Sequence, residues 1–245
     1  MFFYYFFLEA EAVFLIIDAN GKQITSPKQF IKEFPIDLEI VPVLGPIEQN
    51  ESIVTEETVR KGLTSHRASR HFRNYWRYYP NGFDEFAELV KKTWPGMEIE
   101  APKWPNLMRP ELVMFCYEER IPRELYWSGF GFQIWCQLLT HISRCKDATL
   151  LIVDEPEVYL HPDVQRQLVG ILRYCGPDII LASHSPEIMG EADASEILLI
   201  NKKLRSAERI KDIEGVQKSI RYSWFNSEYN LNSISKKWKD SFCRR

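Results

Sequence analysis

The sequence predicts an α/β fold in which a parallel sheet is flanked by helices. Two uninterrupted apolar runs, 148–153 and 178–182, are typical of strands buried on both faces of such a sheet. Between them, an apolar stripe with helical spacing follows Pro162, a residue that suits the first turn of a helix. Short connections between strand, helix and strand favour parallel pairing, and the run 196–200 is expected to add a third buried strand.

The N-terminal region, residues 1–44, is predicted to be an antiparallel β part. An aromatic run over 2–10 and an apolar run over 13–17 are interpreted as strands. Asn20-Gly21 follows the second run, and this dipeptide is a strong hairpin-turn signal because both residues tolerate a positive φ. A short strand is expected within 36–43.

Residues 45–120 are predicted to form a helical insert. In the clearest of its helices, Phe83, Phe86, Leu89 and Val90 recur on one face. Three helices are expected in this insert, at about 48–62, 68–79 and 83–93.

Composition excludes several classes of protein. The chain has 245 residues, of which 45% are hydrophobic and 27% charged, so it is neither a disordered polar chain nor a charged tail. The formal net charge of −3 neither requires nor excludes a polyanionic partner. The opening apolar run is too short to span a bilayer and has no basic segment before it, which favours a strand and a cytoplasmic protein with no membrane contact.

Carboxylates and a histidine follow the two apolar runs. Asp154 and Glu155 come directly after the first run, and His184 follows the second. Ligands of open α/β sheets bind at the carboxyl edge of parallel strands, so we expect these side chains to share one site. Asp154 can hold Mg²⁺, Glu155 can deprotonate an attacking water, and His184 can donate a hydrogen bond to a phosphate oxygen.

A structural interpretation exists for each of these residues. The Asp-Glu-Pro turn could serve only to cap the following helix, and a lone histidine is usually a satisfied core or loop residue. Each structural interpretation explains one residue alone. A nucleotide site explains the whole order of elements, which is a strand, Asp-Glu, a helix, a second strand and Ser-His-Ser, and is therefore favoured.

Three segments carry a resemblance to ABC-type ATPases. Residues 150–162, LLIVDEPEVYLHP, resemble the Walker B motif and D-loop, and residues 179–186, IILASHSP, resemble the switch-histidine segment. The residues in these two motifs are most similar to those of the AAA-type ATPases of the overcoming-lysogenization-defect (OLD) group and of SMC/RecF-like ATPases. Residues 127–133, WSGFGFQ, stand where this family has its signature motif.

The resemblance implies a P-loop NTPase core, with 121–205 as the half that carries these three motifs. It also implies ATP and Mg²⁺ as cofactors, with Asp154 coordinating the metal, Glu155 as catalytic base and His184 sensing the γ-phosphate. The family hydrolyses ATP at the interface of a head-to-head homodimer, and it couples hydrolysis to DNA or to an effector such as a nuclease in phage defence. The residues implied to contact the ATP of the opposite subunit are Ser128, Gly129 and Gln133.

The sequence also departs from that family. It contains no G-x-x-x-x-G-K-[ST] loop, and its one Gly-Lys pair, Gly21-Lys22, is followed by glutamine. After Asp193 there is no D-x-D cluster of the kind an OLD nuclease domain carries, and 206–245 is a basic tail with little periodicity. We therefore expect an incomplete core that binds ATP weakly by itself, and a non-catalytic regulatory or dimerisation subunit is the first alternative.

A basic stretch supplies the second alternative, a nucleic-acid-binding module. Between residues 60 and 80 there are six Lys or Arg and no Asp or Glu. Arginines there are interleaved with aromatic residues, and the two types can contact phosphates and stack on bases. An amphipathic helix with an arginine face is the plainer interpretation. The candidate contacts are Arg67, Arg70, Arg73 and Arg77.

Overall fold

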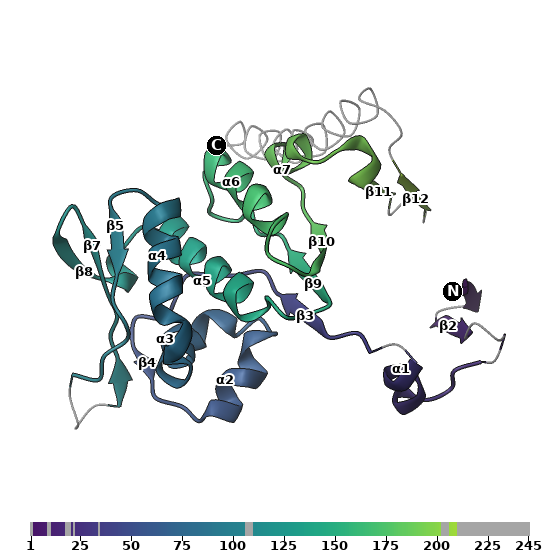
Figure 1. The fold of residues 1–245 in the computed structure, drawn as a ribbon, viewed down its shortest axis with the longest axis horizontal. Helices are drawn as coiled ribbons and strands as arrows, with labels where there is room; N and C mark the ends of the chain where they lie inside the picture. The colour runs from purple at the N-terminus through teal and green to yellow at the C-terminus, as the bar shows by residue number, and fades with distance from the viewer. Residues whose placement is uncertain are drawn as a thin grey trace, which may run out of the picture.

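A three-stranded parallel sheet lies at the centre of the molecule, in the order β10-β9-β3 (Figure 1). The computed structural model describes residues 2–8, 11–17, 21, 23–33, 35–105, 110–201 and 206–209. The predicted parallel pairing is confirmed, because Val153 has Val41 as its partner on one side and Leu181 on the other. The three strands are β3 (Leu38–Val41), β9 (Leu150–Asp154) and β10 (Asp178–Ala182).

The sheet is covered on one face only. Val41, Leu151 and Val153 are at most 1% exposed and pack into the core. On the opposite face Ile40 is 37% exposed and Ile180 is 52% exposed. The prediction of strands buried on both faces is therefore wrong for the described part of the chain. The apolar residues that would make a second buried face are present, but no described element covers them.

Helix α6 (Pro162–Leu172) connects β9 to β10, as the sequence predicts. Its Leu168 and Leu172 are buried against the covered face of the sheet, in the same core as β9. Helix α7 (Pro186–Glu191) follows β10 and packs beside α6 (Figure 1).

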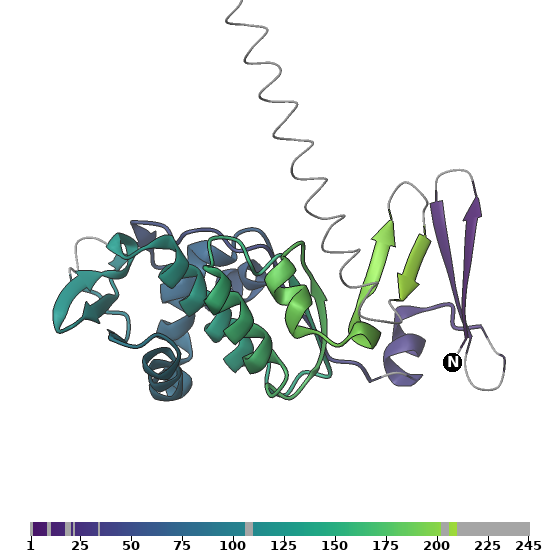
Figure 2. The ribbon, with the colours of Figure 1, turned by 90° about the horizontal axis from the view of Figure 1, so that it is seen from above.

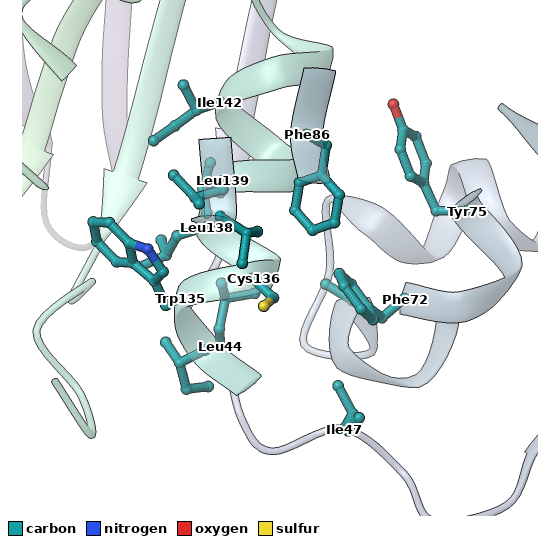
Figure 3. Packing of buried hydrophobic residues seen from close by; sticks show 14 of the residues in the cluster. Leu44, Ile47, Phe72, Tyr75, Phe86, Trp135, Cys136, Leu138, Leu139 and Ile142 are labelled. Carbon is teal, nitrogen blue, oxygen red and sulfur yellow. The ribbon is translucent and has the colours of Figure 1, made fainter. Parts of the chain in front are cut away.

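Helix α5 (Phe130–Arg144) is the centre of the hydrophobic core. It is apolar around most of its circumference, and every residue from Phe132 to Ile142 is buried. Figure 3 shows its side chains packed between those of neighbouring segments. Trp135 Nε1 donates to Thr93 Oγ1 at 2.9 Å, which satisfies the indole within the core. No helix in the described ranges is long and apolar enough to cross a membrane.

The predicted insert contains helices and also short strands. Helix 83–93 is confirmed, whereas 68–79 divides into a 3₁₀ turn and an α-helix. The helix expected from residue 48 starts only at Glu56, because β4 pairs with β6 and Thr55 then caps the helix. The helices are α2 (Glu56–Leu63), η1 (Ala68–His71), α3 (Phe72–Tyr78), η2 (Pro80–Gly82) and α4 (Phe83–Thr93). The strands are β4 (Glu51–Ser52), β5 (Met97–Ile99), β6 (Glu111–Leu112), β7 (Phe115–Glu118) and β8 (Ile121–Glu124).

Two antiparallel hairpins lie at the end of the molecule opposite the β5-β7-β8 sheet (Figure 2). Strands β1 (Phe2–Leu8) and β2 (Glu11–Ile17) pair so that Leu8 faces Glu11. The hairpin turn predicted at Asn20-Gly21 would follow β2; Asn20 lies outside the described residues, and Gly21 has a positive φ of 80°. Helix α1 (Pro27–Glu33) follows.

The run 196–200 does not join the parallel sheet in the described residues, which corrects the sequence prediction. It gives η4 (Ala194–Glu196) and then β11 (Leu198–Asn201), which pairs antiparallel with β12 (Ser206–Arg209). The first four residues of the predicted basic tail are thus a strand, and the rest of that prediction, 210–245, lies outside the described residues.

A buried histidine in α5 makes the stability of the fold depend on pH. Burial, and then the positive charge of Arg144, lower the pKa of His141 to about 3. Its Nδ1 accepts a hydrogen bond from Arg144 Nε at 3.1 Å, so the imidazole is neutral in the folded chain. An unfolded histidine, with a pKa of roughly 6.5, takes up a proton as the pH falls from about 6.5 to 3, and the folded one does not.

We therefore expect the free energy of unfolding to fall with pH through this window. Between pH 7 and pH 5 the contribution of His141 is about 2 kcal/mol. Urea unfolding at both values should show a smaller loss, by that amount, in His141→Gln than in the wild type. An equal loss in the two proteins would show that His141 does not cause it.

Candidate functional site

The carboxyl ends of β9 and β10 bring the predicted catalytic residues together. Asp154 is paired with Ala182 in the sheet, and the backbone N–H of Glu155 donates to the Ala182 carbonyl at 2.9 Å. His184 then lies with its Nε2 3.5 Å from Glu155 Oε1. Three side chains that are up to 30 positions apart in sequence thus share one sheet edge.

The structure excludes two of the structural alternatives for these residues, the helix cap and the core histidine. Helix α6 is capped by His161, whose Nδ1 accepts from the N–H of Asp163, so Asp154 and Glu155 do not cap that helix. The His184 side chain is 84% exposed, so it is not a core histidine. Neither helix capping nor core packing accounts for these side chains.

The backbone at Glu155 has an unusual conformation. Its φ is 42°, in the left-handed region that non-glycine residues rarely adopt. Such a residue costs on the order of 1–3 kcal/mol and persists where its surroundings hold it, often at functional sites. Here the hydrogen bond from Glu155 to β10 holds the turn, and Tyr159 in the same loop also has a positive φ, of 65°.

Asp154 suits a metal that arrives together with phosphate. In the described part of the chain, no group of three His, Cys, Asp or Glu side chains could hold an ion by protein ligands alone. Mg²⁺ is usually bound by one or two carboxylates, with phosphate oxygens and water completing its octahedron. The exposed Asp154 carboxylate at the strand end fits that requirement.

Ser128 and Gly129 lie at the start of α5. Gly129 is the N-cap residue of that helix, and Ser128 Oγ donates to the carbonyl of Leu125 at 2.6 Å, across the turn η3 (Leu125–Trp127). A side chain at Gly131 would place its Cβ 3.0 Å from the Tyr159 carbonyl. The first turn of α5 therefore touches the loop that follows β9.

Gln133 does not face a nucleotide, which corrects the role inferred for it from the resemblance. It is completely buried. Its Nε2 donates to the carbonyls of Tyr126 and Ser128, at 2.8 and 3.0 Å, and its Oε1 accepts from the N–H of Ile47. The side chain holds the segment before α5 in place and has no polar atom left for a ligand.

Arg73 is also buried, so its prediction as a nucleic-acid contact is wrong. Its side chain is 0% exposed. The guanidinium donates to Glu124 Oε1 at 2.7 Å and to the carbonyl of Glu48 at 2.8 Å, and lies 3.4 Å from Glu51 Oε2. Glu124 in turn accepts from the N–H of Tyr126, so this cluster anchors the turn that leads to Ser128.

The other three candidate arginines are exposed. Arg70 forms an ion pair with Glu48, with 3.0 Å between Nε and Oε1. Arg77 lies over the Tyr78 ring, 4.9 Å from its centroid. Arg67 is exposed at the start of η1. Fewer of the candidate arginines are accessible to a polyanion than the sequence predicts.

A parallel sheet, a helical insert and carboxylates at the strand ends are features of an AAA-type nucleotide-binding domain. Residues 25–190 match the family described as "AAA domain, putative AbiEii toxin, Type IV TA system". The match spans more than half of the chain, and the chain belongs to this family of AAA domains. No curated protein matches the sequence significantly.

One solved structure of an SMC ATPase shares the fold, and two structures of SMC heads have lower TM-scores. A structure from work on "ATP-driven dimerization and DNA stimulated activation of SMC ATPases" is 14% identical, with a TM-score of 0.50, and the alignment covers 62% of this chain and 96% of that one. The SMC head domain from Thermotoga maritima is 13% identical over 85% of this chain and 73% of its own, with a TM-score of 0.46. The Smc head from Pyrococcus furiosus, bound to the C-terminal domain of ScpA, is 15% identical over 56% and 39%, with a TM-score of 0.38.

Proposed function

We propose that the carboxyl edge of β9 and β10 is a site of Mg²⁺-dependent ATP hydrolysis. The observation that carries the proposal is the position of His184, 3.5 Å from Glu155 and one strand away from Asp154. Attack of water on a terminal phosphate requires a general base, a hydrogen-bond donor to the phosphate oxygens and a carboxylate that binds the metal. Membership of the AAA family supports ATP as the nucleotide.

Each residue has one role in the proposed reaction. Glu155 accepts a proton from the attacking water, whose oxygen forms a bond to the γ-phosphorus while the bond to the ADP oxygen breaks. His184 donates a hydrogen bond to a γ-phosphate oxygen. Asp154 holds Mg²⁺, which when bound neutralises charge on the phosphates.

The phosphates of ATP need a phosphate-binding loop, and the 245-residue sequence has no P-loop motif. We propose that a further strand and helix bearing such a loop pack on the open face of the sheet. Exposed Ile40 and Ile180 supply an apolar surface for the helix. In the described residues β10 pairs only with β9, so its outer edge is free for the strand. Alone, the chain should bind ATP weakly.

We further propose that the site is completed by a second copy of the chain, in an OLD-like arrangement. Ser128 and Gly129 would then contact the ATP held at Asp154 and Glu155 of the other copy. Exposed aromatic side chains surround this segment, as expected of a surface that becomes buried on association. They are Trp127, Phe130 and Tyr159.

Comparison of Mg-ATP turnover in the wild type and in Glu155→Gln tests the hydrolytic role. The alternative is a regulatory subunit that associates but does not turn over ATP. Absence of turnover in the wild type would favour that alternative.

Coupling to DNA is a second proposal, supported by the three exposed arginines. We expect single-stranded DNA to bind weakly and less tightly as salt increases, because arginine contacts release counterions from the phosphates. Replacing Arg67 and Arg77 with alanine should lower the slope of log affinity against log salt by about 1.4. A matched Arg123→Ala variant, which removes another exposed arginine, should leave the slope unchanged. Fluorescence anisotropy measures both, and affinity that does not respond to salt contradicts the proposal.

A further inference from the structure

We infer that Glu157, to which the motifs assign no role, is the positioning residue that holds His184 beside Glu155. The inference rests on the proposed function of that edge of the sheet. Glu157 lies in the loop after β9, two positions beyond Glu155, and reaches across to the loop after β10.

The contacts of Glu157 are directed at the histidine segment. Its Oε1 accepts from the backbone N–H of His184 at 2.6 Å and from Ser183 Oγ at 2.9 Å. Hydrogen bonds to a carboxylate are about twice as strong as those between neutral groups. Its Oε2 is buried and has no hydrogen-bond partner among the described residues, so in this conformation the carboxylate relies on those two donors.

A second layer extends the connection. Ser183 Oγ accepts from the N–H of Ser185 at 3.0 Å, and Ser185 Oγ donates to Gln165 on α6. Gln165 Nε2 donates back to the carbonyl of Leu160, in the same loop as Glu157, at 2.8 Å. The loops after β9 and β10 are therefore closed into one hydrogen-bonded unit.

This unit matters because it holds the backbone that carries the largely exposed His184 side chain. Catalytic groups need fixed geometry, and displacement by about an ångström can cost on the order of a hundredfold in rate. Glu157 fixes the backbone of the residue proposed to donate to the phosphate, while the bond from Glu155 to Ala182 fixes the backbone of the base.

The test measures amide hydrogen exchange at His184 by NMR in the wild type, Glu157→Ala and Glu157→Gln. Exchange at His184 should quicken about ten- to a hundredfold in Glu157→Ala. Glu157→Gln keeps an oxygen acceptor and should stay within about threefold of the wild type. The matched control is Glu187→Ala, which removes a carboxylate that accepts from Ser185 Oγ at 3.2 Å.

Turnover of Mg-ATP supplies the second readout. In Glu157→Ala, kcat should fall about tenfold or more while KM changes less than about threefold, and Glu157→Gln should restore most of kcat. Unchanged exchange at His184 in Glu157→Ala overturns the inference, as does a rise in KM with kcat unchanged. If the wild type shows no turnover, the proposed function fails, and the exchange measurement still decides whether Glu157 holds His184.

Discussion

Replacement of Arg73 with leucine is expected to lower the free energy of unfolding by about 3–5 kcal/mol. The substitution leaves Glu51, which is 1% exposed, without its cation, and it removes two donors from Glu124. Burial already raises the pKa of Glu51, and the hydrogen bonds from Asn74 and Arg73 act against that rise. For a chain of this size the melting temperature should fall by roughly 6–20 °C, measured by circular dichroism.

Arg70→Leu is the matched control. Arg70 is three positions away and also pairs with a glutamate, but both partners are exposed, so the loss should be about 1 kcal/mol or less. Adding Glu51→Gln to Arg73→Leu should recover part of the stability, because it removes the uncompensated charge and keeps one oxygen for the two N–H donors of Asn74, which both bond Oε1. The recovery is only partial, because the backbone N–H of residue 73, which donates to Oε2, loses its acceptor. If Arg73→Leu and Arg70→Leu lower the free energy of unfolding equally, the buried cluster stabilises the fold no more than the exposed ion pair does.

The sheet illustrates how far the sequence leads. The apolar runs at 148–153 and 178–182 predict both strands and their parallel pairing, because helix-sized connections impose that direction. The same runs lead to the wrong prediction that the strands are buried on both faces. An apolar pattern shows which faces of a strand can be covered, but it does not show which element covers them. Only the pairing of β3 with β9, from residues more than 100 positions away, shows which strand is the neighbour.

Some residues of the candidate site could also be placed from the sequence, and others could not. Asp154, Glu155 and His184 could be placed together because parallel strands end at a common edge, which follows from the order of elements alone. Gln133 and Arg73 could not be placed, because polar side chains on helices face the core or solvent according to tertiary packing. Glu157 stands in the motif, yet nothing in its spacing shows that it reaches His184.

Substitution of Glu155 by glutamine should lower ATP turnover by two to four orders of magnitude, the usual contribution of a general base. Glutamine has nearly the same size, and Glu155 is half-exposed, so the fold and the weak affinity for ATP should be retained. Asp178→Asn is the matched control, since Asp178 is an exposed carboxylate at the opposite end of β10. Because Ser128 and Gly129 are proposed to act on the ATP of a second copy, turnover per chain should rise with protein concentration.

Phosphate release from millimolar Mg-ATP, with the wild type, Glu155→Gln and Asp178→Asn side by side, tests the central claim most directly. We expect slow turnover by the wild type and Asp178→Asn, dependent on Mg²⁺, and none above background in Glu155→Gln. Turnover that survives in Glu155→Gln would remove Glu155 from the role of base. Absence of turnover in all three would contradict a hydrolytic site at the ends of β9 and β10.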